Sequence, residues 1–178
     1  MKLIQCNDSH LRGVTDFYHQ AVAYLETHIN YPFWSSEHPS DESIKEAVSR
    51  GEQYACMEGD EIIGAVLLSE FPDGDYDAGN WSRDLKEGEY LSVHVLAVSS
   101  ERYQSGVGSF MIGECISIAR ARGYRAVRRD IVPTNTPAKR LYQKNGFVYA
   151  GTVDLKRPTA PIPLFDLYEL NLDQASDA

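Results

Sequence analysis

Apolar residues recur at helical spacing twice in the first third of the chain. Between positions 9 and 29 they fall three or four residues apart, and Pro32 would stop the helix that they predict. Ser40 precedes two acids and then a second apolar stripe. A serine side chain caps free backbone amides, and acids suit the positive end of a helix dipole. We therefore expect two helices between residues 9 and 50, after a short strand over residues 1–6.

Strand patterns alternate with helix patterns in the rest of the chain. Glu58-Gly59-Asp60 lies between two apolar segments and predicts a hairpin. The centre of segment 89–98 is apolar except for His94, which suits a strand buried on both faces. Further helices are expected after Gly106-Val107-Gly108, ending at Gly123, and from Thr136-Pro137 to Asn145-Gly146. The expected strands are 1–6, 53–57, 61–71, 89–98, 126–132, 147–155 and 164–172.

This order of elements predicts the fold class. The middle strands alternate with helices, whereas the first and last strands form hairpin-like sets. We expect a mixed α/β fold with a central, mostly antiparallel sheet of about seven strands and helices on both faces. The length of 178 residues and the 43% of hydrophobic residues suit one globular domain over residues 1–178. Residues 72–88 are polar and acidic and are expected to form a long loop.

Cysteine usage and hydropathy exclude several classes of protein. Cys6, Cys56 and Cys115 are an odd number without a Cys-x-x-Cys pair, so neither a disulfide framework nor a zinc ribbon is expected. The longest apolar run, residues 62–68, is too short to span a bilayer, and the first residues lack the apolar core of a signal peptide. Four histidines in helix and loop context have no ligand spacing. We expect a cytoplasmic protein without a metal or a membrane partner.

Charge is distributed unevenly along the chain. The net charge is −9, but residues 120–157 hold ten lysines and arginines against two aspartates. Acids are concentrated in residues 69–90 instead. A chain that separates charge in this way could hold an anionic ligand on one side and a cationic one on the other. Nucleic acid is disfavoured as a partner, because the basic residues are not interleaved with aromatics and the whole chain is acidic.

The most informative segment runs from a strand through a glycine-containing turn into a helix. Gly106 and Gly108 allow a ligand to approach the backbone closely. The helix that begins there presents free N–H groups, which can bind a pyrophosphate. Met111 occupies the position where a Gly-x-Gly-x-x-Gly motif needs its third glycine, and no Gly-Lys-Ser/Thr follows. The turn therefore differs from the two better-known phosphate loops.

Two motifs give this chain a resemblance to a known family. A strand ending Leu-Ala-Val at residues 96–98 leads to the Gly-x-Gly turn. Residues 135–147 read Asn-Thr-Pro-Ala-Lys-Arg-Leu-Tyr-Gln-Lys-Asn-Gly-Phe. Over about residues 89–155 the chain resembles the GCN5-related N-acetyltransferase (GNAT) superfamily. Tyr103 departs from the pattern, because the family prefers glutamine or arginine there. Arg102 or Gln104 could supply the missing polar contact.

The resemblance implies acetyl-CoA as the acetyl donor and a primary amine, in a small molecule or a peptide, as the acceptor. It implies that backbone amides of the turn hold the pyrophosphate and that the strand before the turn pairs with the pantetheine arm. Asn135 would contact that arm, and Lys144 or Arg140 the adenosine phosphate. The cofactor-binding residues expected on this basis are Leu96, Ala97, Val98, Tyr103, Gln104, Ser105, Gly106, Val107, Gly108, Ser109, Asn135, Ala138 and Lys144.

The same resemblance suggests the catalytic groups. Tyr142 stands at the family's tyrosine position and would protonate the departing thiolate, because a phenol stays protonated at neutral pH. His94 lies two residues before Leu96. Imidazoles ordinarily titrate near neutral pH, so His94 could accept the amine's proton. Glu89 or Asp130, acting through water, are rival bases. A strand amide near Leu96 would stabilise the tetrahedral oxyanion.

Several questions stay open at the level of sequence. The acidic loop 70–89, with Tyr76 and Trp81, could hold a cationic amine by charge and by cation–π contact, or could be a solvated loop. Phe33 and Trp34 are candidates for a substrate wall or for core positions. A coenzyme-binding sensor or scaffold without turnover would share the donor site but need no acid or base. The hairpin and the last strands could pair with a second copy in a homodimer.

Overall fold

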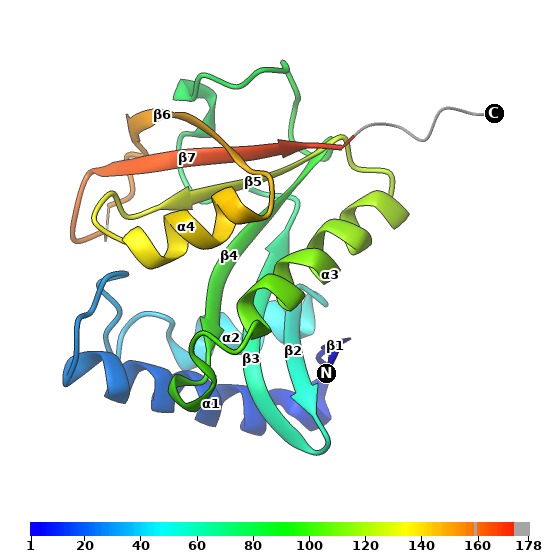
Figure 1. Cartoon of the computed structure of the whole chain (residues 1–178), viewed down its shortest axis with the longest axis vertical. Coiled ribbons are helices and arrows are strands. Elements are labelled where there is room, and N and C mark those ends of the chain that lie inside the picture. The colour runs from blue at the N-terminus through cyan, green and yellow to red at the C-terminus, as the bar shows by residue number, and fades with distance from the viewer. Residues whose placement is uncertain (159, 173–178) are drawn as a thin grey trace. The chain divides into compact units, whose positions relative to one another are not determined.

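The computed structural model of the chain describes residues 1–158 and 160–172 and has a mixed α/β architecture (Figure 1). In these residues seven strands form one sheet in the order β1-β2-β3-β4-β5-β7-β6. The prediction of a mostly antiparallel sheet of about seven strands is confirmed. The strands are β1 (Lys2–Gln5), β2 (Gln53–Glu58), β3 (Glu61–Ser69), β4 (Tyr90–Val98), β5 (Ala126–Ile131), β6 (Val148–Asp154) and β7 (Leu164–Asn171). The helices are α1 (Leu11–Glu26), α2 (Asp41–Ser49), α3 (Val107–Ala121) and α4 (Thr136–Lys144).

The chain divides into two compact units. The first unit consists of residues 1–68 and 94–114, and the second of residues 69–93 and the described residues from 115 onward. The boundaries cut through β4 and α3.

In the first unit, α1 and α2 bury their apolar faces in a shared core. Val14, Phe17 and Tyr18 of α1 pack in one cluster with Ile44 and Val48 of α2. The expected start of α2 is confirmed, since the Ser40 side chain accepts a hydrogen bond from the Ser43 amide at 3.2 Å. The core cluster is completed by residues from β2, β3 and β4.

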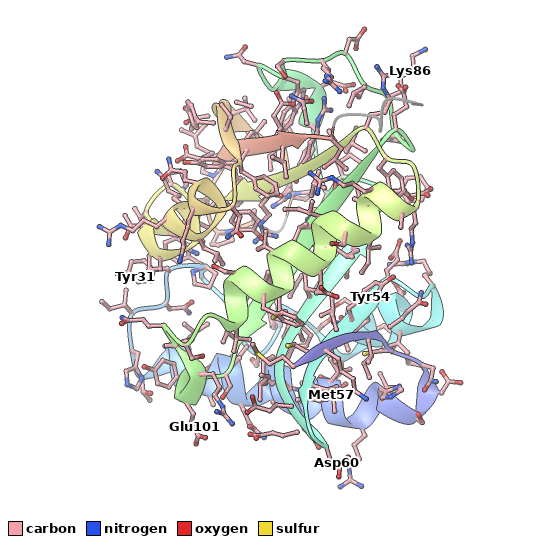
Figure 2. All side chains as sticks on the ribbon, turned by 45° about the vertical axis from the view of Figure 1, so that its right-hand side comes forward. Tyr31, Tyr54, Met57, Asp60, Lys86 and Glu101 are labelled. Carbon is pink, nitrogen blue, oxygen red and sulfur yellow. The ribbon has the colours of Figure 1, made fainter. Side chains whose placement is uncertain are left out.

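The predicted hairpin of the first unit joins β2 to β3. The two strands pair antiparallel, from Gln53 opposite Leu67 to Glu58 opposite Glu61. Figure 2 labels Tyr54 and Met57 along β2 and Asp60 at the turn of the hairpin. β1 pairs antiparallel with β2 on its other side. β3 ends at Ser69, two residues before the end that the sequence pattern predicts.

Strand β4 differs from the prediction of a strand buried on both faces. Its first four residues, Tyr90–Val93, are buried, but His94, Val95 and Leu96 are only half-buried. Val95 has a φ of 48°, which a β-branched residue rarely adopts and which interrupts the regular strand. Parallel pairing with β5 is recorded from Tyr90 to Ser92. The second half of β4 is therefore accessible where the apolar run predicts complete burial.

The second unit contains an antiparallel set, β5-β7-β6, beside the first half of β4 (Figure 1). Helix α4 begins as the sequence predicts, with Pro137 in its first turn. The loop over residues 72–88 is better ordered than its polar composition suggests. It contains a 3-10 turn, η2 (Tyr76–Ala78), and buries Tyr76 and Leu85 in a cluster with Phe165 and Leu167.

Membrane-spanning helices and metal-binding groups of side chains are both absent from the described residues. No helix within residues 1–158 and 160–172 is long and apolar enough to cross a bilayer. Those residues also contain no group of three His, Cys, Asp or Glu side chains arranged to hold a metal ion. Cys6, Cys56 and Cys115 are all buried free thiols.

Candidate functional site

The turn between β4 and α3 has an unusual backbone. It begins with a 3-10 turn, η3 (Ser100–Arg102), and continues through two residues with left-handed conformation, Gln104 at φ 62° and Gly106 at φ 90°. A Cβ added to Gly106 would meet no atom within 4 Å, so this glycine faces open space. Alternating backbone conformations of this kind turn successive N–H groups toward one side and form an anion-binding concavity.

The turn opens directly into the first turn of α3. The first four N–H groups of an α-helix have no partner within the helix, and the helix dipole adds partial positive charge there. Residues 103–106 are exposed, while Gly108 and Ser109 are half-buried at the helix start. The geometry therefore fits a pyrophosphate bound by backbone amides, as the glycine spacing predicts.

Local hydrogen bonds hold the turn in shape. The carbonyl of Arg102 accepts from the Ser105 amide at 3.3 Å and from the Ser105 hydroxyl at 2.5 Å. The carbonyl of Gly106 accepts from the Phe110 amide at 3.0 Å, which begins the helix. The turn is tied to β3 through the Ser99 amide, which donates to the Ile63 carbonyl at 2.9 Å.

The two polar side chains proposed to replace the family's glutamine or arginine have different surroundings. The Arg102 guanidinium forms an ion pair with Glu58 at 2.7 Å and lies 3.7 Å from Glu61, so it is engaged with the β2–β3 hairpin. The Gln104 side chain is exposed at its left-handed position. Of the two, Gln104 is the better placed to contact a ligand on the turn.

Tyr103 packs toward α1. Its ring meets the ring of Tyr24 edge-on, with 5.6 Å between centroids, and burial raises the pKa of its hydroxyl. Tyr103 and Tyr24 line a pocket of about 140 Å³ together with Ser99, Ser100 and Glu101, the last of which Figure 2 labels. The sequence carries no signal for this pocket, because Tyr24 lies within the predicted helix without a motif around it.

The strand residues expected to meet the pantetheine arm lie just before this turn. Leu96 and Val98 are half-buried, whereas Ala97 is buried in the core of the first unit. Gly64 on β3 permits close packing here, since a Cβ at that position would lie 2.5 Å from the Met111 sulfur and 3.1 Å from the Ala97 carbonyl oxygen. His94 is half-buried in the same strand.

In the second unit, Tyr142 occupies the buried face of α4. Its side chain is 1% exposed, and its ring meets Phe147 edge-on at 5.1 Å. The Arg129 guanidinium carbon lies 5.9 Å from the ring centroid. The Tyr142 hydroxyl is buried and has no hydrogen-bond partner among the described residues. Burial raises the pKa of this hydroxyl far above its ordinary value.

Asn135 and Lys144 lie at the two ends of α4. Asn135 caps the helix, because its side-chain oxygen accepts from the Ala138 amide at 3.1 Å. The capping bond uses the oxygen of Asn135 and leaves its side-chain amide group for other contacts. Lys144 is exposed in the last turn, and Arg140 is also exposed. Both can reach a phosphate at the surface of this unit.

The two rival bases are engaged in other interactions. Asp130 is buried, accepts a hydrogen bond from the Tyr76 hydroxyl at 2.5 Å and pairs with Arg157 at 2.9 Å through both oxygens. Glu89 accepts from the Lys86 amide and from Arg125, and these contacts lower its pKa. A carboxylate with a lowered pKa is a weak proton acceptor near neutral pH.

Three ion pairs join the acidic loop to the basic stretch within the second unit. Trp81, a candidate for binding a cationic amine, instead covers the guanidinium of the buried Arg128 at 4.1 Å. The loop therefore offers fewer free carboxylates and aromatic faces than its composition suggests. The pairs are Glu89 with Arg125 (2.8 Å), Asp75 with Lys156 (2.6 Å), Asp73 with Arg157 (3.1 Å) and, outside the loop, Asp166 with Lys139 (2.7 Å).

The structure thus gathers the predicted site residues into two groups. The first unit brings His94, residues 96–98 and residues 103–109 together along β4 and its following turn. The second unit brings Asn135, Ala138, Tyr142 and Lys144 together on α4. Trp34, a candidate for a substrate wall, is buried against Tyr18, whereas Phe33 is exposed.

Comparison with known proteins places these groups in context. A family model described as acetyltransferase (GNAT) family matches residues 19–147. A search of curated proteins finds no significant match. Solved structures of low sequence identity share the fold. A ribosomal-protein-alanine N-acetyltransferase from Brucella melitensis is 16% identical with a TM-score of 0.71, and the match covers 97% of this chain and 100% of that one.

Two further similar structures contain acetyl-CoA. A GNAT superfamily phosphinothricin acetyltransferase from Sinorhizobium meliloti, in complex with acetyl-CoA, is 16% identical with a TM-score of 0.69, covering 97% of this chain and 89% of that one. The protein yncA from Salmonella typhimurium, with its cofactor acetyl-CoA, is 14% identical with a TM-score of 0.70, covering 100% and 97%.

Proposed function

The chain belongs to the acetyltransferase (GNAT) family, and we propose that it transfers the acetyl group of acetyl-CoA to a primary amine. The observation that carries this proposal is the turn after β4, with its two left-handed residues and its open glycine, inside the segment that the family model matches. The acetyl-CoA complexes among structures of the same fold support the choice of donor.

The proposed donor site uses mainly backbone groups. The amides of residues 104–109 bind the pyrophosphate, because they stand at the start of α3 and at its preceding turn. Residues 96–98 pair with the pantetheine arm as a strand pairs with an added strand. Asn135 and Ala138 contact the arm from α4, and Lys144 meets the adenosine phosphate. Acetyl-CoA supplies the thioester carbonyl that the amine attacks.

The proposed chemistry assigns one proton transfer to each catalytic residue. His94 accepts a proton from the ammonium form of the acceptor, because only the neutral amine is a nucleophile. The amine nitrogen then bonds to the carbonyl carbon, and a strand amide near Leu96 donates to the oxyanion of the tetrahedral intermediate. The C–S bond breaks as Tyr142 protonates the departing sulfur, and the nitrogen releases its second proton, which returns through water to the Tyr142 phenolate. The Tyr142 hydroxyl is protonated at neutral pH, as a proton donor must be, although burial raises its pKa and makes it a weaker acid.

An amine acceptor is favoured over other nucleophiles by the name of a similar structure, the N-acetyltransferase from Brucella melitensis. We extend that chemistry to this chain as a small-molecule or peptidic amine. The buried free thiols of Cys6, Cys56 and Cys115 suit a reducing compartment, which supports a cytoplasmic location. A homodimer stays a prediction.

The test of donor binding is thermal unfolding with and without acetyl-CoA. A ligand at ~100 times its dissociation constant adds about 2.7 kcal/mol to the stability, which raises Tm by several degrees. Gly106→Asp should abolish that shift, because it adds a negative charge and a side chain at φ 90°. Gly59→Asp is the matched control, since Gly59 also has a positive φ and no neighbour within 4 Å, but lies in the hairpin turn.

The test of turnover is release of free thiol from acetyl-CoA in the presence of a panel of primary amines. Amine-dependent release that is lost in Tyr142→Phe would support the proposed enzyme. A Tm shift without release for any amine would favour a coenzyme-binding sensor instead. If millimolar acetyl-CoA gives no Tm shift in the native protein, the proposed function is wrong.

A further inference from the structure

Val95 interrupts β4 between His94 and the segment proposed to meet acetyl-CoA. Its φ of 48° lies in the left-handed region, which is strongly disfavoured for a residue with a branched Cβ. Such a conformation persists only where the surrounding structure holds it in place. No glycine or proline stands at this point of β4 to explain the irregularity. The contacts of Val95 should therefore include the group that maintains it.

That group is the hydroxyl of Tyr18, on α1. It donates a hydrogen bond to the Val95 carbonyl at 2.9 Å across 77 residues of sequence. The Tyr18 side chain is 1% exposed, and its ring is held by edge-on contacts with Phe17 at 5.8 Å and Trp34 at 6.0 Å. The ring has little freedom to move, so the hydroxyl has a fixed position.

Gln53 on β2 also bonds to the Tyr18 hydroxyl. Its side-chain amide nitrogen, in a residue 1% exposed, donates to the Tyr18 hydroxyl at 3.2 Å and lies 3.1 Å from the Val66 carbonyl. An amide nitrogen only donates, so the Tyr18 oxygen is the acceptor in this contact. The Tyr18 proton is then available for the Val95 carbonyl. Two hydrogen bonds therefore link the Gln53 side chain through the Tyr18 hydroxyl to the Val95 carbonyl, on the backbone of β4.

We infer that Tyr18 and Gln53 are positioning residues of the acetyl-transfer site, which hold the Val95 carbonyl and thereby fix the backbone of residues 94–98. The inference rests on the proposed function, because those residues carry His94 and the strand that would meet the thioester. Neither side chain touches the substrate in this scheme. Their effect passes through the backbone, where a displacement of about 1 Å can cost about a hundredfold in rate.

The test compares Tyr18→Phe with a control of similar stability cost. Tyr18→Phe keeps the ring packing and removes only the hydroxyl, so we expect kcat to fall about tenfold to a hundredfold. The KM for acetyl-CoA should change by a smaller factor than kcat, because residues 96–98 meet the pantetheine arm but the pyrophosphate-binding turn at Gly106 is unaltered. Ile44→Val removes one methylene from the core of the same unit and should leave kcat unchanged. Equal losses of kcat in the two variants would overturn the inference.

Hydrogen exchange separates this inference from the proposed function. In the coenzyme-free protein, the amide protons of residues 94–98 should exchange faster in Tyr18→Phe than in the native chain. Ile44→Val should leave these exchange rates unchanged. If the native chain shows no acetyl transfer, the proposed function fails, while the exchange rates still decide whether Tyr18 holds β4. Native exchange rates together with native kcat in Tyr18→Phe would refute the role of Tyr18.

A second variant covers the case in which Tyr18→Phe does not fold. Gln53→Met keeps the Tyr18 hydroxyl but removes its donor, so the hydroxyl can still bond to Val95 with a less fixed orientation. We expect a smaller fall in kcat than for Tyr18→Phe and faster exchange confined to residues 94–98 and the strand around position 53. A loss of stability in Gln53→Met with native kcat and native exchange in β4 would also refute the inference.

Discussion

The guanidinium carbon of Arg128 lies 4.1 Å from the centre of the Trp81 ring. Tyr90 covers the same group at 4.2 Å, and Arg128 is 2% exposed. Desolvation lowers the pKa of Arg128, and the Glu169 carboxylate lies 3.9 Å away. The buried cation is therefore compensated by two aromatic faces as well as by a carboxylate. This contact fixes the loop of residues 72–88 to β5.

The role of the Trp81 ring can be measured by two substitutions. Both Trp81→Phe and Trp81→Leu lose the hydrogen bond from the indole nitrogen to the Tyr76 carbonyl. Only Trp81→Phe keeps an aromatic face over Arg128, so it should be more stable than Trp81→Leu by about 0.5–2 kcal/mol. The free energy of unfolding from denaturant titration gives this difference directly. Equal stabilities would show that the ring contributes only its apolar area.

Tyr142→Phe should affect activity and stability in different directions. The substitution removes the proposed acid, so kcat should fall by about 10²–10⁴-fold. The free energy of unfolding should stay equal or rise, because the hydroxyl that is removed is buried and has no hydrogen-bond partner among the described residues. Steady-state kinetics and denaturant titration measure the two effects.

Tyr168→Phe is the control for Tyr142→Phe, since Tyr168 is a buried tyrosine on β7 of the same unit. It should leave kcat at the native value. If Tyr142→Phe keeps native kcat, the acid role is wrong. If it lowers the stability by more than about 1 kcal/mol, the hydroxyl makes a favourable interaction in solution.

Stability should fall at alkaline pH because buried tyrosines resist ionisation. Burial raises the pKa of Tyr142, and burial together with the Asp130 carboxylate raises that of Tyr76. In the unfolded chain these phenols lose their protons near pH ~10. Above that pH the unfolded state binds fewer protons than the folded state, so the free energy of unfolding decreases as the pH rises.

Comparison of the native chain with Tyr142→Phe isolates the contribution of one phenol. A single such group changes the free energy of unfolding by about 1.4 kcal/mol per pH unit above pH ~10. The variant should therefore lose stability less steeply than the native chain between pH 10 and 11.5, with no difference in slope at pH 7–9. Identical slopes above pH 10 would mean that the Tyr142 phenol ionises as readily in the folded state as in the unfolded one.

Much of the fold could be predicted because its determinants are local. The cap at Ser40, the proline at position 137 and the left-handed Gly123 mark helix ends within a few residues of sequence, and all three are confirmed. The glycine turn was also predictable, since Gly106 has a left-handed φ of 90°, which favours glycine, and faces open space. The strand positions followed from apolar segments bounded by turn residues in the same way.

The features that escaped prediction depend on partners distant in sequence. Val95 belongs to an apolar run that indicates a regular strand, and the Tyr18 hydroxyl that bonds to it reads as one more position of the α1 stripe. Trp81 reads as a possible amine-binding ring, because nothing local shows that Arg128 lies beneath it. The period and spacing of apolar residues show which face of a helix or strand is buried. They do not show which polar groups from distant segments meet at that face.

Asp130 provides a last test of the catalytic assignment. Asp130→Asn keeps the shape of the side chain but removes the charge that compensates Arg157, which pairs with it at 2.9 Å. We expect the free energy of unfolding to fall by about 1–3 kcal/mol, since a guanidinium that is 14% exposed loses one of its two carboxylate partners and keeps Asp73. At temperatures where the variant is folded, kcat should stay within about threefold of the native value, because Asp130 transfers no proton in the proposed reaction.

The control for this variant is Asp84→Asn, which removes a charge from an exposed aspartate of the same unit. It should change neither the free energy of unfolding nor kcat, because an exposed charge contributes little to stability. A fall of kcat by a hundredfold or more in Asp130→Asn, with a native response in Asp84→Asn, would assign the base to Asp130 rather than to His94. The pH profile of kcat would then identify a carboxylate in place of an imidazole, since the two groups titrate in different ranges.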